Sequence, residues 1–305
     1  MLDDFKINKL EKSKQIVSSD EIKRVKGLGF LQVRGTDFFN ARVITVNGKV
    51  TTKQMNTIIE AANLYGNGEV AMTARLTIEV QGVHYDNIDN FIEYLKKGGL
   101  ETGGTGPKVR PVVSCKGTTC QYGLIDTFQL SEKIHKEFYV KYHNLVLPHK
   151  FKIAVGGCPN NCVKPSLNDI GVIGQRIPVV DLEKCRGCKK CVIETSCPIK
   201  SAYLEEGKIN LGEKCNSCGR CVGKCPFGVI DGYKTGYKVY IGGRWGKSYN
   251  IATPLTKVFE TEEEVLKVID KIILLFKNEG ISGERFADTI SRLGFDYVNN
   301  KLLSD

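Results

Sequence analysis

The sequence predicts an α+β protein, and three observations carry that prediction. Within the first 105 of the 305 residues, strand and helix signals follow one another in the order ββαββα, which is typical of helices packed on one face of an antiparallel sheet. All twelve cysteines lie between Cys115 and Cys225, in three groups of four. Two of these groups fall in a short, glycine-containing stretch that interrupts the α/β pattern. We therefore expect four segments, at residues 1–105, 106–180, 181–232 and 233–305, of which the third is a small inserted domain.

The first segment is expected to open with a charged, helix-prone lead-in over residues 1–25 and to continue as a sheet with two helices. Four short apolar runs predict the strands, at Phe30–Arg34, Phe39–Val46, Glu69–Ala74 and Leu76–Val80. Thr51, followed three residues later by Gln54, forms a capping-box pattern at the start of the first helix. The second helix is expected from about Asp86 to Lys97, before a pair of glycines that ends it.

The rest of the main body is expected to contain a helix at Ile125–Tyr142, a strand at Phe151–Val155 and a returning strand at Tyr237–Ile241. Thr261 and Glu264 repeat the capping-box pattern before a C-terminal helix. The apolar residues of this helix recur at helical spacing, and we interpret them as core packing.

Composition and charge narrow the class of protein. No run of 18 apolar residues occurs, so the sequence predicts no membrane span. The N-terminus lacks the apolar stretch of a signal peptide, and we expect a cytoplasmic protein. The formal net charge of +10 suits an acidic donor protein, an anionic cofactor or an oxyanion. We expect no nucleic-acid binding, because the basic residues are spread along the chain and no recognised binding motif accompanies them.

The inserted segment carries two runs of cysteines. The first run is Cys185, Cys188, Cys191 and Cys197, and the second is Cys215, Cys218, Cys221 and Cys225. The second run has the spacing of bacterial ferredoxins, in which the fourth ligand of each [4Fe–4S] cluster comes from the other run. The first run is longer by two residues before its last cysteine. A pair of zinc sites is the alternative, but zinc requires neither the third evenly spaced cysteine nor the proline that follows each run.

This pattern assigns four ligands to each of two clusters. One cluster is expected on Cys185, Cys188, Cys191 and Cys225. The other is expected on Cys215, Cys218, Cys221 and Cys197.

Four further cysteines precede the insert, as Cys115-x4-Cys120 and Cys158-x3-Cys162. Four soft thiolates with no nearby histidine favour either an iron–sulfur site or a four-thiolate zinc site. The spacing of these pairs does not by itself decide between the two.

The sequence around these pairs resembles the sirohaem sulfite and nitrite reductase family. Cys158 and Cys162 lie in the segment GGCPNNC, and residues 147–152, LPHKFK, are similar to the family's Leu-Pro-Arg-Lys-Phe-Lys strand. Matching positions are also found at Arg42, Arg110 and Thr73-Ala74-Arg75. The position of the insert is similar to that in anaerobic and dissimilatory sulfite reductase subunits. Many members have five residues within the first cysteine pair, whereas this chain has four.

The resemblance implies a fold and a set of cofactors. Residues 1–105 would form a ferredoxin-like half-domain, and residues 106–180 and 233–305 a sirohaem-binding α/β domain. Residues 181–232 would be an inserted bacterial ferredoxin domain with two clusters. One sirohaem and three [4Fe–4S] clusters are implied. The third cluster would be held by Cys115, Cys120, Cys158 and Cys162, and Cys162 would also ligate the sirohaem iron.

The resemblance also implies roles for basic residues. Arg75 would help to hold the sirohaem, a polycarboxylate that requires a basic pocket. The four cations that would face the substrate are Arg42, Arg110, Lys150 and Lys152. Such cations bind the oxygens of an oxyanion and polarise its bonds. Lys150 and Lys152 alternate along the predicted strand, so both project from one face.

The implied reaction is the six-electron reduction of sulfite to sulfide, with electrons delivered through the two ferredoxin-type clusters. Nitrite is the alternative substrate, and Lys152 favours sulfite because dedicated assimilatory nitrite reductases often have Asn at that position. The non-enzyme alternative is a polyferredoxin-type electron-transfer protein without sirohaem, which would not need the four cations. The glycine-rich stretch Gly98–Gly106 is either a flexible linker or a backbone that wraps around haem carboxylates.

Two kinds of partner are expected: a source of electrons and a second copy of the reductase repeat. No Gly-x-Gly-x-x-Gly fingerprint follows a strand, so we expect electrons from a separate ferredoxin or from a flavin- or NAD-linked partner subunit. The chain carries one copy of the reductase repeat, whereas longer family members carry two. We therefore expect it to pair with itself or with a homologous subunit.

Overall fold

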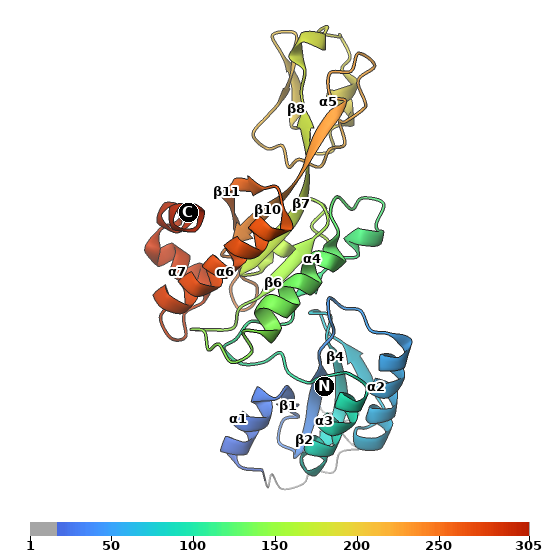
Figure 1. Ribbon diagram of the computed structural model, residues 1–305, viewed down its shortest axis with the longest axis vertical. Coiled ribbons are helices and arrows are strands. Elements are labelled where there is room, and N and C mark those ends of the chain that lie inside the picture. The colour runs from blue at the N-terminus through green and yellow to red at the C-terminus, as the bar shows by residue number, and fades with distance from the viewer. Residues whose placement is uncertain (1–16, 305) are drawn as a thin grey trace, which may run out of the picture. The chain divides into compact units, whose positions relative to one another are not determined.

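The computed structural model describes residues 17–304, so the first sixteen residues of the expected lead-in lie outside the described residues. The chain divides into two compact units (Figure 1). The first contains the described residues through Val113, Ser131–Ile153 and Phe276–Phe286. The second contains Ser114–Leu130, Ala154–Leu275 and the described residues from Ala287 onward.

The first unit is built on a four-stranded antiparallel sheet with helices beside it. Its strands are β1 (Phe30–Gln32), β2 (Phe38–Val43), β3 (Val70–Met72) and β4 (Ile78–His84), in the spatial order β1-β2-β4-β3. Its helices include α1 (Ser19–Gly27), α2 (Thr52–Tyr65) and α3 (Ile88–Lys97). The predicted ββαββα order of residues 30–97 is confirmed.

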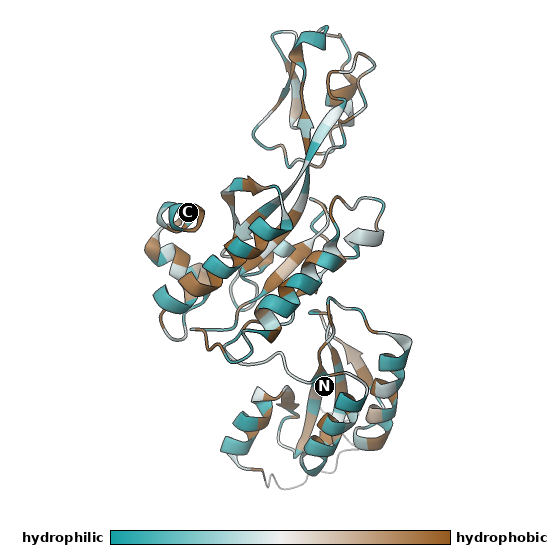
Figure 2. Cartoon of the chain, viewed as in Figure 1, coloured by the Kyte–Doolittle hydropathy of each residue, from teal (hydrophilic) through white to brown (hydrophobic). Residues whose placement is uncertain are grey.

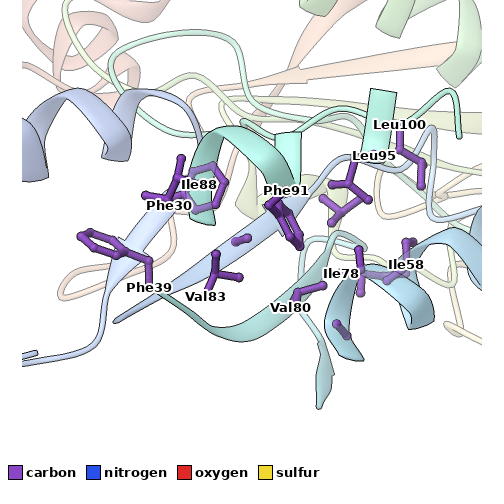
Figure 3. Close-up of a cluster of buried hydrophobic side chains, with 14 of the residues drawn as sticks. Phe30, Phe39, Ile58, Ile78, Val80, Val83, Ile88, Phe91, Leu95 and Leu100 are labelled. Carbon is purple, nitrogen blue, oxygen red and sulfur yellow. The ribbon is translucent and has the colours of Figure 1, made fainter. Parts of the chain in front are cut away.

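One face of this sheet forms a hydrophobic core with the helices. Along β2 the residues alternate in burial, and Phe39, Ala41 and Val43 are fully buried. They pack with Ile58 of α2 and Phe91 of α3, as Figure 3 shows. Because side chains of a strand alternate between faces, Arg42 lies on the opposite face of the sheet.

The capping box predicted at the start of α2 is confirmed. The amide of Gln54 donates to the Thr51 hydroxyl at 3.1 Å, and the Thr51 amide donates to the Gln54 side chain at 2.9 Å. The second predicted helix begins two residues late, because Tyr85–Asn87 forms a 3₁₀ turn ahead of α3.

The second unit contains a five-stranded sheet in the order β11-β10-β7-β6-β5. Its strands are β5 (Val113–Ser114), β6 (Ile153–Gly156), β7 (Ile170–Val179), β10 (Gly232–Ile241) and β11 (Thr253–Phe259). The predicted strand at Phe151 starts late, because Phe151 forms only an isolated bridge with Val109 and β6 begins at Ile153. The returning strand is longer than predicted, since β10 pairs with all ten residues of β7.

The insert extends from the far end of the β7–β10 ladder (Figure 1). It contains the short helix α5 (Val192–Ser196) and a hairpin of β8 (Ala202–Glu205) and β9 (Lys208–Leu211). Its own small core is formed by Ile193, Ala202, Ile209, Cys221, Val229 and Ile230. Because so few apolar residues are buried there, cofactors or other cross-links are expected to contribute to the stability of this segment.

The remaining helices are α4 (Thr127–Ile134), α6 (Glu262–Glu279), α7 (Phe286–Leu293) and α8 (Phe295–Leu303). The predicted helix at Ile125–Tyr142 is therefore only partly α-helical, because His135–Val140 is a π-helix. The capping box before α6 is confirmed by the bonds from Glu264 to Thr261 at 3.2 Å and from Thr261 to Glu264 at 3.4 Å. Figure 2 shows apolar and polar residues alternating along the helices. Among the described residues, no helix combines the length and apolar character needed to cross a bilayer.

Candidate functional site

A cluster of arginines lies on the face of the first sheet that does not contact the helices. The register of β2 and β4 places Arg42 directly opposite Glu79. The Arg42 guanidinium donates to one Glu79 oxygen from Nη2 at 2.6 Å and from Nε at 3.1 Å. The two side chains are only 21% and 17% exposed. This half-buried ion pair fixes the direction of Arg42 and leaves its third nitrogen, Nη1, for another partner.

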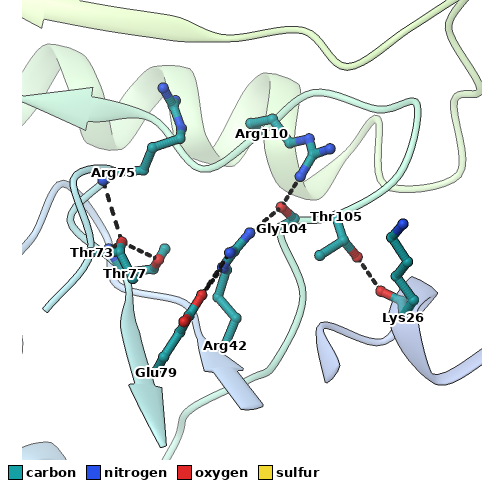
Figure 4. Close-up of polar contacts among 9 residues, drawn as sticks. All are labelled: Lys26, Arg42, Thr73, Arg75, Thr77, Glu79, Gly104, Thr105 and Arg110. Carbon is teal, nitrogen blue, oxygen red and sulfur yellow. Dashed lines mark hydrogen bonds and ion pairs between the residues drawn. The ribbon is translucent and has the colours of Figure 1, made fainter. Parts of the chain in front are cut away.

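That partner is the backbone of the glycine-rich segment. The carbonyl of Gly104 accepts from Nη1 of Arg42 at 3.3 Å and also from Nη1 of Arg110 (Figure 4). Gly104 has a φ of +71°, and a Cβ there would approach the Pro111 ring to 2.9 Å. A side chain at this position would therefore displace the peptide that joins the two guanidinium groups.

The glycine-rich segment is held along β2. The amide of Ile44 donates to the carbonyl of Glu101 at 2.9 Å, and the amide of Gly103 donates to the carbonyl of Arg42 at 3.1 Å. Thr102 also forms an isolated antiparallel bridge with Val43. The flexible-linker interpretation of this segment is therefore wrong for residues 101–104, whose backbone is hydrogen-bonded to the sheet.

Tyr139 of the π-helix completes this arrangement. Its hydroxyl is hydrogen-bonded by the backbone of Gly104, and burial raises the pKa of this tyrosine above its usual range. Its ring stacks on His135 with the ring centres 4.8 Å apart. Burial likewise lowers the pKa of His135, which favours the neutral imidazole. Sequence analysis missed Tyr139 and Glu79, because neither carries a motif and both act through partners that are distant in the chain.

Arg75 lies in the turn between β3 and β4. Its Nη2 donates to the carbonyl of Pro111 at 2.8 Å. The turn is closed by Thr73, whose hydroxyl accepts from the amide of Arg75 at 3.3 Å and lies 2.8 Å from the hydroxyl of Thr77 (Figure 4). Arg42, Arg75 and Arg110 are thus all fixed within the first unit by backbone carbonyls.

The two lysines flank a fully buried phenylalanine. Phe151 stacks with Phe276 and Phe286, with ring centres 5.5 and 5.4 Å apart. Phe151 and Ile153 are fully buried, so burial alternates over residues 150–153 just ahead of and into β6. The amide of Arg110 donates to the carbonyl of Phe151 at 2.7 Å, which ties the backbone of Arg110 to the lysine pair. Both lysines are half-buried.

In the second unit, the structure brings together the two cysteine pairs that precede the insert in the sequence, Cys115 with Cys120 and Cys158 with Cys162. Burial raises the pKa of Cys158, and the charges of Cys115, Cys162 and Cys120 raise it further. The two pairs also meet through the backbone, because the amide of Gly157, the residue before Cys158, donates to the Cys115 sulfur. The loops that carry them are in contact, because a Cβ on Gly157 would lie 2.8 Å from the Cα of Gly117. We refer to these four residues as the inner cysteine group.

Backbone amides already face sulfur atoms in these loops. The amide of Gly157 donates to the Cys115 sulfur at 3.1 Å, and the amide of Asn160 bonds the Cys158 sulfur and lowers its pKa in part. Such bonds stabilise thiolates and tune the clusters that thiolates hold.

The insert brings together one of the two predicted ligand sets directly. Burial raises the pKa of Cys221 to about 11, and Cys215, Cys218 and Cys197 contribute to that rise. Three cysteines of the second run and the last cysteine of the first line one small pocket, as Cys215, Cys218, Cys221 and Cys197. Burial acts to raise the pKa of Cys197 as well, but backbone amides near Ser201 and Ala202 lower it overall.

Three of the four residues of the other predicted set share a packing surface, and Cys197 of the first set packs on it too. Cys185, Cys191 and Cys225 all pack against the small core of the insert. Gly187, between Cys185 and Cys188, has a φ of +61°, and a Cβ there would lie 2.7 Å from the carbonyl oxygen of Gly207. A glycine is therefore required for the tight loop of the first run.

The donor chemistry of these groups fits iron–sulfur clusters. Each consists of thiols without a histidine or carboxylate, a set that suits iron–sulfur or zinc. Within residues 17–304, no three His, Cys, Asp or Glu side chains are grouped as ligands of a single metal ion.

Comparison with known proteins covers nearly the whole chain. Residues 31–98 match the family described as the nitrite/sulfite reductase ferredoxin-like half domain. Residues 105–305 match the family described as the nitrite and sulphite reductase 4Fe-4S domain.

Individual relatives agree with these matches. A coenzyme F420-dependent sulfite reductase of Methanocaldococcus jannaschii is 30% identical over 277 residues, which are 90% of this chain and 42% of that protein. The alpha subunit of the dissimilatory-type sulfite reductase of Allochromatium vinosum is 25% identical over 90% of this chain and 71% of its own length. The chain thus spans less than half of the first of these relatives.

A solved structure has the same fold. The crystal structure of dissimilatory sulfite reductase I superposes with a TM-score of 0.69 at 22% identity, over 88% of this chain and 69% of that chain. The mixed α/β architecture described above is therefore that of sulfite and nitrite reductase structures.

Proposed function

Because the chain belongs to the nitrite and sulfite reductase family, we propose that it reduces sulfite to sulfide at a sirohaem coupled to a [4Fe–4S] cluster. The observation that carries this proposal is the meeting of the two loops that hold the inner cysteine group: the amide of Gly157 donates to the Cys115 sulfur at 3.1 Å, and a Cβ on Gly157 would lie 2.8 Å from the Cα of Gly117. A four-thiol group of this kind, in a chain matched to the family over residues 105–305, is what the coupled centre requires.

In this proposal the inner cysteine group holds the cluster and Cys162 also ligates the sirohaem iron. The sirohaem would supply an open iron position and a macrocycle that accepts electrons one at a time. Cys162 is exposed, whereas its three partners are only partly exposed. An accessible sulfur suits a residue shared between two cofactors. Arg75 would pair with a carboxylate of the sirohaem.

The substrate would be bound by Arg42, Arg110, Lys150 and Lys152. Sulfite is a dianion that takes up six electrons and seven protons and leaves as hydrosulfide and three waters. Arginine offers a planar fork of donors to its oxygens, and lysine offers a compact charge that also carries a proton. The bonds of both guanidinium groups to Gly104 position these donors before substrate arrives, which is the condition for electrostatic stabilisation of developing charge.

Electrons would reach the inner cysteine group through the two clusters of the insert. The grouping of Cys197 with three cysteines of the second run supports the exchange of fourth ligands that characterises two-cluster ferredoxins. A separate ferredoxin, or a flavin- or NAD-linked partner subunit, would supply these electrons. We further propose that the chain pairs with itself or with a homologous subunit.

The test is sulfide production by anaerobically purified, sirohaem-loaded protein with reduced methyl viologen as electron source. The wild-type protein is expected to form sulfide from sulfite. Cys162→Ala is expected to lose activity by about a hundredfold or more, since even the loss of a residue that only supports a metal ligand commonly costs about tenfold to a hundredfold. Ser196→Ala, in the insert but outside the cysteine groups, serves as the control and is expected to retain activity.

Two other outcomes would overturn the proposal. Ammonia from nitrite without sulfide from sulfite would show that nitrite is the substrate. Neither product, with the iron–sulfur clusters present, would leave the polyferredoxin alternative.

A further inference from the structure

The two cysteine runs of the insert lie in different surroundings. The second run is attached to β7 of the main sheet. The amide of Arg176 donates to the carbonyl of Ser217 at 2.8 Å, and Arg176 forms a parallel bridge with Cys218. A Cβ on Gly219 would lie 2.2 Å from the Arg176 side chain. The second run is therefore in direct contact with β7 of the main sheet.

A cavity connects the second run to the inner cysteine group. It measures about 530 Å³ and is lined by Cys158, Pro159 and Asn160 on one side and by Pro198, Cys218 and Gly219 on the other. Arg220, between the last two evenly spaced cysteines of the second run, stacks over Tyr122 with 5.1 Å to the ring centre. No residue of Cys185–Cys191 is among the described residues that line this cavity.

The residues between the evenly spaced cysteines of the first run are exposed and carry positive charge. Arg186, Lys189 and Lys190 lie within it, and all three are exposed. Among the described residues, none of the three is paired with an acidic side chain, in contrast to Lys184, which pairs with Asp181 at 3.2 Å.

An exposed aromatic ring lies beside these cations. The guanidinium of Arg186 stacks over Phe227, with 4.5 Å to the ring centre. Phe227 is 38% exposed and follows Cys225, the expected fourth ligand of the same cluster, by two residues. We call Arg186, Lys189, Lys190 and Phe227 the outer patch.

We propose that the outer patch binds an acidic one-electron donor protein of the ferredoxin type, so that electrons enter at the cluster on the first run and leave through the cluster on the second. This inference rests on the proposed function. In each encounter the donor's reduced cluster is oxidised by one electron and the cluster of the first run is reduced by one, with no atom transferred. Six encounters supply one sulfite.

The chemistry of the patch favours an acidic protein. Unpaired exposed cations accelerate encounter with an opposite charge and orient it, and an exposed aromatic residue among them provides apolar contact once water is expelled. Electron entry at this run is also consistent with the position of the second run, which lines the same cavity as Cys158.

The test compares two electron sources for the clusters of the holoprotein without sulfite present. The variant carries Arg186→Glu, Lys189→Glu and Lys190→Glu. Stopped-flow reduction of the holoprotein by a reduced acidic two-cluster ferredoxin is followed at the red band of the sirohaem, where the ferredoxin does not absorb. It is expected to slow by about tenfold or more at low salt, and to lose most of its dependence on ionic strength. Reduction by photoexcited 5-deazariboflavin, a small uncharged reductant that releases no sulfite, is expected to match the wild type.

A control variant carries the same change in charge outside the insert, as Lys247→Glu, Lys267→Glu and Lys277→Glu, all at exposed positions. It is expected to remain within about twofold of the wild type, because steering depends on local charge. An equal loss in both variants would overturn the proposal in favour of net charge, and no loss in either would show that the donor binds elsewhere.

A milder variant and a comparison with sulfide production separate a loss of donor binding from damage to the protein and from failure of the reaction. If the triple variant also slows with deazariboflavin, the milder Lys189→Gln and Lys190→Gln variant replaces it, and an unchanged ferredoxin rate there would contradict the proposal. Since this reduction requires no sulfite, failure of this docking is distinguishable from failure of the proposed reaction, which would appear as normal reduction without sulfide.

Discussion

At the scale of single residues, the peptide group of Gly104 joins three side chains. Its carbonyl accepts from Arg42 and Arg110, and its backbone bonds Tyr139. Charge-assisted hydrogen bonds of this type are stronger than neutral ones. The two arginines are therefore held in fixed directions by a residue that has no side chain.

This arrangement predicts a selective loss in Arg42→Ala. If Arg42 binds the oxyanion, kcat/KM for sulfite should fall by about a hundredfold to a thousandfold, as when one donor to developing charge is removed. Arg34→Ala is the matched control, because Arg34 is exposed on the turn between β1 and β2. Steady-state sulfide production measures both. A loss in Arg42→Ala no larger than in Arg34→Ala would remove Arg42 from the substrate site.

Some residues of the candidate site could be predicted from the sequence and others could not. The cysteine groups could be proposed because ligand spacing reflects cluster geometry, and Cys197 lines one small pocket together with Cys215, Cys218 and Cys221. The pairing of Arg42 with Glu79 could not be predicted from the sequence, because a bulge between Phe39 and Ala41 shifts the register of β2 against β4. No local pattern indicates that Tyr139 contacts Gly104, because the contact depends on a π-helix.

At the scale of elements, caps and burial patterns determine what could be predicted. Both capping boxes, before α2 and α6, could be recognised because their bonds are local. β7 could not be recognised by alternation, because its first six residues are all buried and a strand buried on both faces has no period. The hairpin of β8 and β9 was also missed among the dense glycines and cysteines of the insert.

The capping box of α2 is expected to contribute measurably to the free energy of unfolding. Thr51→Ala should lower the free energy of unfolding by about 1 kcal/mol, since it removes the acceptor for the Gln54 amide. Thr52→Ala, at the next and also exposed position, is the control and should change stability by less than about 0.5 kcal/mol. Urea unfolding followed by circular dichroism compares the two. Equal effects would show that the cap is not stabilising.

At the scale of the whole molecule, each unit carries a different part of the proposed chemistry. The first contains the basic residues proposed to bind the substrate and the sirohaem, and the second contains all twelve cysteines. The net charge of +10 is consistent with a polycarboxylate cofactor, an oxyanion substrate and an acidic donor. The family could be inferred from the sequence because its motifs are short and local. The identity of the donor and the oligomeric state could not, because they depend on surfaces that a single chain does not display as motifs.

The most direct test of the central claim is the visible absorption spectrum of anaerobically purified protein, recorded together with its iron content and acid-extracted haem. The proposed function predicts chlorin-type bands near the red end of the spectrum, with iron for three cubanes and one haem. Iron for three clusters without a chlorin would contradict the reductase unless added sirohaem restored activity. Iron for only two clusters and no chlorin would show that Cys115, Cys120, Cys158 and Cys162 do not hold the coupled centre.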